Sequence, residues 1–243
     1  MKTYGLIGQS LKHSFSQAFF ESYFNQHTID AQYLNFELVS IKDFPKLVEN
    51  QNINGLNVTI PYKEEIIQYT NELSDVAKKV GAVNVLQFSQ GKIIGHNSDV
   101  FGFRQSVKPF LTFHHEKALI IGTGGAAKAV AYALRELGIE VIFLSRSPKN
   151  EHEFSYQLAN KIMIGAIKLI INTTPVGMYP NESGQIPLCY EAMTEDHLVI
   201  DLIYNPSETK FLQEAKKHGA TTLNGESMLK HQALQSWEIW NQL

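Results

Sequence analysis

Short apolar runs alternate with amphipathic stretches along the chain, the pattern of an α/β protein with largely parallel sheet. Strands are predicted at 3–7, 32–36, 55–58, 117–121, 140–144, 168–172 and 198–201, and helices at 43–49, 100–107, 126–137 and 228–241. A further helix is predicted to begin near Ser16, because Phe19, Phe20, Tyr23 and Phe24 recur at helical spacing. That stripe of aromatic side chains should be buried in a core.

The pattern restarts after about the first hundred residues, which predicts two α/β halves. A hairpin of 83–88 and 92–94, turning at Gln90-Gly91, should close the first half. We place the boundary near Asp99, with the helix 100–107 as the link. The last helix need not belong to the half that precedes it.

Composition and charge narrow the functional classes. The chain has 243 residues, with 21 Lys and Arg against 24 Asp and Glu, so it carries no general attraction to nucleic acid or anionic lipid. Its apolar runs are far shorter than the roughly 20 residues that cross a bilayer. The only cysteine, Cys189, can form no intrachain disulfide and excludes a cysteine-based zinc cage. We therefore expect a cytoplasmic protein with no metal, membrane or nucleic-acid partner.

A glycine-rich turn between a buried strand and a helix predicts a dinucleotide site in the second half. In ALIIGTGGAAKAVAYAL, Gly122, Gly124 and Gly125 let the backbone approach a ligand closely. The free N–H groups at the start of the following helix favour a pyrophosphate there.

The residues after the next strand favour NADP over NAD. An NAD site usually offers Asp or Glu at this point, but this chain has Ser145, Arg146 and Ser147. Arg146 can pair with a 2′-phosphate through two hydrogen bonds, with Ser147 and Lys149 as helpers. The alternative is that Arg146 is an ordinary solvated surface arginine.

Polar side chains gather where strands of the first half end. They are Ser14, Ser16, Asn57, Thr59, Lys63, Asn84, Asn97, Ser98 and Asp99. Strand ends in α/β sheets converge on a binding crevice, so this set indicates a small polyhydroxylated ligand. Each residue also has a local interpretation; Ser16 could cap the following helix, and Asp75 could cap the short helix before Gly81.

These motifs, taken in order, resemble those of the shikimate dehydrogenases. The strings are LIGQSLKHSFSQAFF, GLNVTIPYKE, GAVNVL, GHNSDVFGF, IIGTGGAAKAVAYAL, NTTPVGM, DLIYNP and GESMLKHQAL. The resemblance covers nearly the whole chain and implies reversible NADP-dependent reduction of 3-dehydroshikimate to shikimate, in the pathway to aromatic amino acids. It also implies a substrate domain at 1–98, completed by a helix at 226–243, and a Rossmann NADP domain at 99–225, in a monomer or homodimer.

The resemblance also assigns residues. Catalytic roles fall on Lys63 and Asp99. Substrate contacts fall on Ser14, Ser16, Asn57, Thr59, Lys63, Asn84, Asp99, Tyr204 and Gln232. Cofactor contacts fall on Gly122, Thr123, Gly124, Gly125, Ala126, Ser145, Arg146, Ser147, Lys149, Thr173, Thr174, Leu202 and Gly225. The family's usual Asn-Arg-Thr is Ser-Arg-Ser here, and 150–167 looks abbreviated, as if a strand or helix were trimmed.

Two questions stay open on sequence alone. Lys63 could exchange protons with the substrate, or the nearby Asp99 could keep it charged so that it stabilises an alkoxide. The chain could also be a quinate/shikimate dehydrogenase, or a silent NADP-binding sensor. Serine at both 14 and 16 favours shikimate, and the presence of Lys63 and Asp99 disfavours the sensor.

Overall fold

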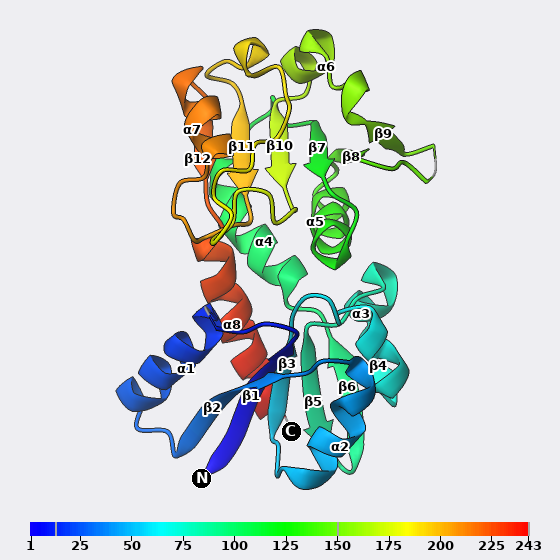
Figure 1. Cartoon of the computed structure of the whole chain (residues 1–243), viewed down its shortest axis with the longest axis vertical. Helices are drawn as coiled ribbons and strands as arrows, with labels where there is room; N and C mark the ends of the chain where they lie inside the picture. The colour runs from blue at the N-terminus through cyan, green and yellow to red at the C-terminus, as the bar shows by residue number, and fades with distance from the viewer. Residues whose placement is uncertain (13, 150, 243) are drawn as a thin grey trace. The chain divides into compact units, whose positions relative to one another are not determined.

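The computed structural model describes residues 1–12, 14–149 and 151–242, which divide into two compact units. Unit 1 comprises Met1–Gly102 and Leu229–Leu243, and unit 2 comprises Phe103–Met228. Each contains a six-stranded sheet with helices packed on it (Figure 1). Two helices, α4 (Asp99–Val107) and α8 (Glu226–Asn241), run from one unit into the other. The mixed α/β architecture predicted from the sequence is confirmed.

Unit 1 is built on a mixed sheet in the order β2-β1-β3-β5-β6-β4. Its elements are β1 (Lys2–Gly8), α1 (Phe15–Gln26), β2 (Ala31–Glu37), α2 (Phe44–Asn50), β3 (Gly55–Val58), β4 (Glu72–Leu73), α3 (Asp75–Val80), β5 (Val85–Ser89) and β6 (Lys92–His96). Strand β5 runs antiparallel to both β3 and β6. The predicted hairpin is confirmed, and Gln90 and Gly91 turn it with φ of 51° and 74°.

Helices cover both faces of this sheet. On one face, the predicted aromatic stripe of α1 packs with α8, where Phe20 stacks on Tyr33 and lies 5.4 Å from Trp240 between ring centroids. On the other face, α2 and α3 bury Phe44 and Ala77 against the sheet. Gly55 gives the Trp240 indole room to lie on the strand, since a Cβ there would collide with the ring. The strand ends are thereby held between two packed layers.

Two predicted helix caps are wrong. Helix α1 begins at Phe15, so Ser14 and not Ser16 occupies the capping position, and the Ser14 side chain makes no capping bond. Helix α3 is capped by Ser74, whose hydroxyl accepts a hydrogen bond from Ala77 N at 3.2 Å. Asp75 lies inside the first turn, where a negative charge still favours the helix dipole.

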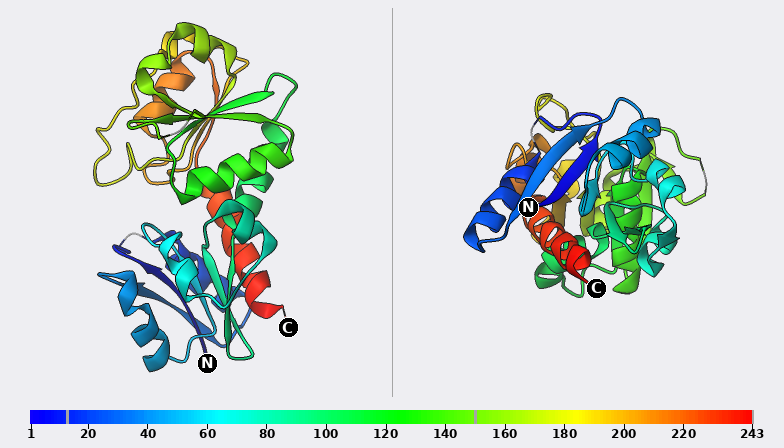
Figure 2. Two further views of the ribbon diagram at one scale, coloured as in Figure 1. Left: turned by 90° about the vertical axis from the view of Figure 1, so that its right-hand side faces the viewer. Right: turned by 90° about the horizontal axis from the view of Figure 1, so that it is seen from below.

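Unit 2 has a wholly parallel sheet in the order β12-β11-β10-β7-β8-β9, the strand order of a Rossmann fold. Its remaining elements are β7 (Lys117–Ile121), α5 (Gly125–Glu136), β8 (Glu140–Ser145), β9 (Glu153–Ser155), α6 (Lys161–Ala166), β10 (Leu169–Asn172), β11 (Leu198–Asp201), α7 (Lys210–Lys217) and β12 (Thr221–Leu223). Helix α5 lies on one face, and α6 and α7 lie on the other (Figure 2).

The segment predicted to be abbreviated keeps its strand. Residues 150–167 supply β9 and the short helix α6, so the sheet still has six strands. Among the described residues of 146–152, which join β8 to β9, no helix is present. Within the described residues, no helix is long and apolar enough to cross a membrane.

Candidate active site

An ion pair between Lys63 and Asp99 lies at the centre of the polar cluster in unit 1. Lys63 follows β3 and Asp99 begins α4, and Lys63 Nζ lies 2.7 Å from Asp99 Oδ2. The Lys63 side chain is 15% exposed and that of Asp99 only 1%. Asn84 Nδ2 donates to Asp99 Oδ1 at 2.8 Å, so both carboxylate oxygens have a donor. The ammonium is therefore held in place while two of its three N–H groups remain for a ligand.

A buried chain of hydrogen bonds runs from this cluster to β2 and α8. Tyr33 Oη donates to Asn57 Oδ1 at 2.8 Å, and Asn57 Nδ2 donates to Ser236 Oγ at 2.8 Å. Ser236 Oγ lies 3.4 Å from Ser98 Oγ, and Asn84 Nδ2 donates to Ser98 Oγ at 3.1 Å. Asn57 and Asn84 are thus each oriented from more than one side.

The two serines of the first loop differ in their partners. Ser14 Oγ is buried and has no hydrogen-bond partner among the described residues, so a polar group is available where a ligand could satisfy it. The Ser16 hydroxyl hydrogen-bonds Tyr33, while burial raises the pKa of that phenol. Ser16 therefore joins the same chain of hydrogen bonds as Asn57.

The other predicted substrate residues fall in both units. Thr59 is half-buried beside Gly8, where an added Cβ would contact its methyl group. Gln232 lies one turn before Ser236 on α8, and its carbonyl accepts the Ser236 hydroxyl at 2.9 Å. Tyr204 belongs to unit 2, in the segment after β11.

Sequence reasoning missed Tyr33 and Ser236, and it gave Ser98 no more than a place at a strand end. Ser236 is fully buried, three residues after Ala233 and four before Trp240 on the apolar stripe of α8. A serine on such a stripe is a signal that could have identified it, because buried hydroxyls need partners.

In unit 2 the glycine turn has the shape that a pyrophosphate requires. Gly122 has φ of 106°, and a Cβ there would lie 2.7 Å from Thr173 Oγ1, which itself donates to Ile121 O at 2.7 Å. Gly124 is the N-cap of α5, offers no side-chain cap and faces open space. Because the N-cap glycine brings no side chain, a pyrophosphate can approach the start of α5 closely, so the residues present fit the dinucleotide that the sequence predicts.

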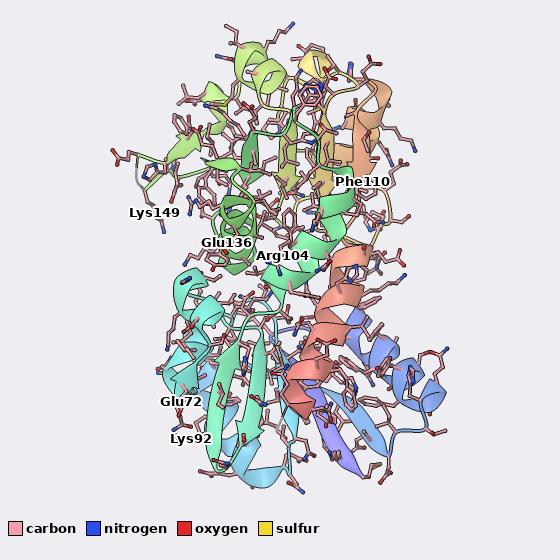
Figure 3. All side chains as sticks on the ribbon, turned by 180° about the vertical axis from the view of Figure 1, so that it is seen from behind. Glu72, Lys92, Arg104, Phe110, Glu136 and Lys149 are labelled. Carbon is pink, nitrogen blue, oxygen red and sulfur yellow. The ribbon has the colours of Figure 1, made fainter. Side chains whose placement is uncertain are left out.

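The loop after β8 carries the predicted 2′-phosphate residues. Arg146, Ser147 and Lys149 are exposed, and Figure 3 shows the Lys149 side chain at the outer end of this loop. Ser145 Oγ accepts from Ser147 N at 3.2 Å, which fixes the bend around Arg146. The charge of Arg146 lowers the pKa of Tyr156 against the larger raising effect of burial, so the guanidinium lies near that ring. The described part of 146–152 contains no helix, so no helix N-terminus there could attract a 2′-phosphate. The side chains of this loop would have to supply the positive charge.

The remaining residues predicted to contact the cofactor follow β10 and β11. Thr173 and Thr174 succeed β10, and Leu202 succeeds β11. Gly225 packs directly on the Leu202 carbonyl and donates its N–H to Ile203 O at 3.0 Å. Thr123 and Ala126 complete the glycine turn, and within the residues that the structure describes no cluster of His, Cys, Asp and Glu could hold a metal ion.

Comparison with known proteins finds one family throughout. Residues 6–86 match the family described as "Shikimate dehydrogenase substrate binding domain". A relative from Clostridium botulinum strain Hall, named shikimate dehydrogenase (NADP(+)), is 38% identical, with 99% of this chain and 96% of the relative covered. The solved shikimate dehydrogenase of Aquifex aeolicus has a TM-score of 0.89 at 34% identity, covering 99% of this chain and 92% of that one.

A Thermus thermophilus shikimate 5-dehydrogenase, solved in complex with NADP(H) and shikimate, has a TM-score of 0.88 at 29% identity. The alignment covers 100% of this chain and 94% of that chain. With the Lys63–Asp99 pair, the glycine turn and these likenesses, the chain belongs to the shikimate dehydrogenase family.

Proposed function

We propose that the chain catalyses the reversible NADPH-dependent reduction of 3-dehydroshikimate to shikimate. The observation that carries this proposal is the buried cluster of Lys63, Asp99 and Asn84, beside which Asn57 is held in a fixed orientation. Relatives named shikimate dehydrogenase (NADP(+)), one of them 38% identical over 99% of the chain, support the same reaction and cofactor.

Substrate recognition follows from the donors and acceptors of unit 1. The unpaired Ser14 hydroxyl and Ser16 would bind the carboxylate of the substrate, and Asn57, Thr59 and Asn84 its ring hydroxyls. Asn57 and Asn84 are each held on more than one side by the protein, so the polar atoms that they present to a ring hydroxyl have a fixed direction, and this direction favours one hydroxyl arrangement over others. Tyr204 and Gln232 are the further contacts in this proposal.

Lys63 is the group that meets the developing charge. When bound, NADPH supplies the hydride to the carbonyl carbon. The carbonyl oxygen then needs a proton, and the Lys63 ammonium can donate a hydrogen bond to it and deliver that proton. Asp99 Oδ2, 2.7 Å from Lys63 Nζ, fixes the direction of the ammonium, so in this proposal Lys63 acts as a preorganised donor.

The assignment of domains is part of the proposal. Residues 1–98 with 226–243 bind the substrate, and 99–225 bind NADP. The family match at 6–86 and the glycine turn of α5 support this division, and the compact units change between Gly102 and Phe103. The proposal also includes a cytoplasmic location, which the single cysteine supports, and a monomeric or homodimeric state.

The test is a two-by-two assay of purified protein with shikimate or quinate and with NADP or NAD, followed by the absorbance of the reduced nicotinamide. We expect rapid reduction of NADP with shikimate. Activity mainly with quinate would show that the reading of Ser14 and Ser16 is wrong, and activity mainly with NAD that the reading of Arg146 is wrong. Cofactor binding without turnover in any combination would support the sensor alternative.

A further inference from the structure

Strand β11 ends in a carboxylate that none of the predicted site residues explains. Asp201 is completely buried, yet its side chain accepts three hydrogen bonds from neutral groups. Oδ1 accepts from Asn172 Nδ2 and from Ile203 N, both at 3.0 Å, and Oδ2 accepts from Thr209 Oγ1 at 2.6 Å. These donors come from β10, from the segment after β11 and from the N-cap of α7, which Figure 1 shows side by side.

The first connection leads to the segment after β10. Because Asn172 Nδ2 points to Asp201, its Oδ1 faces the other way and accepts from Thr174 N at 2.9 Å and Thr174 Oγ1 at 2.7 Å. Turning the amide over would put donors against Thr174 N and leave the carboxylate facing an oxygen. The carboxylate therefore sets the orientation of Thr174 through one side chain.

The second connection leads to the segment after β11. Asp201 Oδ1 holds Ile203 N, and Ile203 O accepts Gly225 N at 3.0 Å, where Gly225 packs on the Leu202 carbonyl. Thr209 Oγ1 also accepts from Leu212 N at 3.4 Å, so the same carboxylate is tied to the start of α7. One side chain thus connects both segments assigned to the cofactor.

We propose that Asp201 is a positioning residue for NADP, whose ionised carboxylate holds Thr174 and the Leu202–Gly225 contact in the arrangement that binds the cofactor. The inference rests on the proposed function, which assigns those segments to NADP. A carboxylate accepts hydrogen bonds roughly twice as strongly as a neutral group. Once protonated, the Asp201 carboxyl group would accept weaker hydrogen bonds from Asn172 Nδ2 and Ile203 N.

The electrostatics of the cluster support a functional reason for the charge. Burial raises the pKa of Asp201 to about 6, although its hydrogen bonds with Thr209, Ile203 and Asn172 lower it. The other titratable groups that face it are Tyr190, whose pKa is raised by burial and by the charges of Glu214 and Asp201, and Glu214 beyond it on α7. Because the pKa of Asp201 is raised in the folded state, its ionised form lowers the free energy of unfolding at neutral pH. If Asp201 had a purely structural role, its charge would bring no gain in stability.

The Asp201→Asn variant keeps the shape of the side chain and removes the charge. We expect its melting temperature without cofactor to equal or exceed that of the wild type, and its Kd for NADP at about pH 7.5, measured by calorimetry, to rise about fivefold or more. Glu214→Gln, a neighbouring acid outside the hydrogen-bonded cluster, is the matched control and should change neither quantity.

The dependence on pH separates charge from shape. The wild type and Asp201→Asn bind the same 2′-phosphate, which itself titrates at about pH 6. The ratio of their Kd values cancels that titration and leaves the effect of Asp201. That ratio should fall toward one between about pH 7.5 and pH 5.5. An unchanged Kd for NADP, a parallel loss of melting temperature and affinity, or a ratio independent of pH would each overturn the inference. If the wild type does not bind NADP, the proposed function itself fails, a result distinct from these three.

Discussion

Removing one buried hydroxyl from α8 should loosen the substrate site and unit 1 together. In Ser236→Ala, Asn57 Nδ2 loses its acceptor at 2.8 Å and keeps only the Asn84 carbonyl at 3.3 Å. A buried donor left unsatisfied costs about 1–3 kcal/mol, and the remaining long bond places this case in the lower half of that range. Alanine returns roughly 0.5 kcal/mol through its higher helix propensity. We expect a net loss of about 1 kcal/mol in the free energy of unfolding.

The assay can be confined to unit 1. Both tryptophans of the chain, Trp237 and Trp240, lie in the part of α8 that belongs to unit 1, and both contact the Tyr4 ring. Tryptophan fluorescence during urea denaturation therefore reports the unfolding of this unit. The KM for shikimate should rise several-fold in the same variant, because Asn57 loses one of the bonds that orient it.

A matched serine on α4 controls for the substitution itself. Ser106 Oγ donates to Phe103 O at 2.8 Å within its own helix. Unlike Ser236 Oγ, it accepts no hydrogen bond from a buried donor among the described residues. Ser106→Ala, followed by circular dichroism because Ser106 lies in unit 2, should change stability by less than about 0.5 kcal/mol. If Ser236→Ala unfolds at the wild-type urea concentration, the hydroxyl does not hold Asn57 and the reasoning is refuted.

Four further measurements test other residues of the two units. Lys63→Ala should lower kcat by roughly 10²-fold or more, and an unchanged kcat would remove Lys63 from the chemistry. Asn35 Nδ2 donates to the Leu11 carbonyl at 3.3 Å and to Gln17 Oε1 at 2.7 Å, and the same carbonyl accepts Ser14 N at 3.1 Å. Asn35→Ala therefore removes support from the loop that carries Ser14, so the KM for shikimate should rise about fivefold with kcat nearly constant; equal changes in both would contradict a positioning role. Burial lowers the pKa of His197, so the folded state binds fewer protons than the unfolded one and the melting temperature should fall as pH drops below about 6.5; His197→Gln should fall less. Arg146→Ala should weaken NADP binding and leave NAD binding unchanged, and equal loss for both cofactors would place Arg146 away from the 2′-phosphate.

Much of the site could be predicted because it lies at strand ends. Asn57, Asn84 and Asp99 occur far apart in the sequence, yet Asn57 lies near the end of β3, Asn84 just before the antiparallel β5 and Asp99 at the start of α4. Motif resemblance then named the same residues, and the structure brings Asn84, Asp99 and Lys63 into direct contact. Local pattern and topology agree here, so no tertiary information was needed.

The supporting residues could not be found in this way. Ser236 bonds Asn57 across 179 positions, and Tyr33 bonds it from a strand that reads as ordinary core. The serine on the apolar stripe of α8 signals a buried hydroxyl, but the local pattern of neither residue shows which residue it bonds. The described part of 146–152 contains no helix between β8 and β9, whereas the sequence indicates only a shortened segment at 150–167, because it shows how many residues remain but not which element they form.

The two buried aspartates show why residue type and position do not determine a role. Asp99 and Asp201 both stand at the edge of a sheet, and both are almost completely removed from water. Asp99 meets Lys63 at 2.7 Å, so its charge is balanced and orients that cation. Asp201 meets only neutral donors, so burial dominates and raises its pKa to about 6. A charge with a partner is suited to chemistry that must stay constant with pH, whereas a charge without one makes the geometry around it depend on pH. Which of the two applies is decided by whether a cation folds back onto the carboxylate, and that is a property of the fold alone.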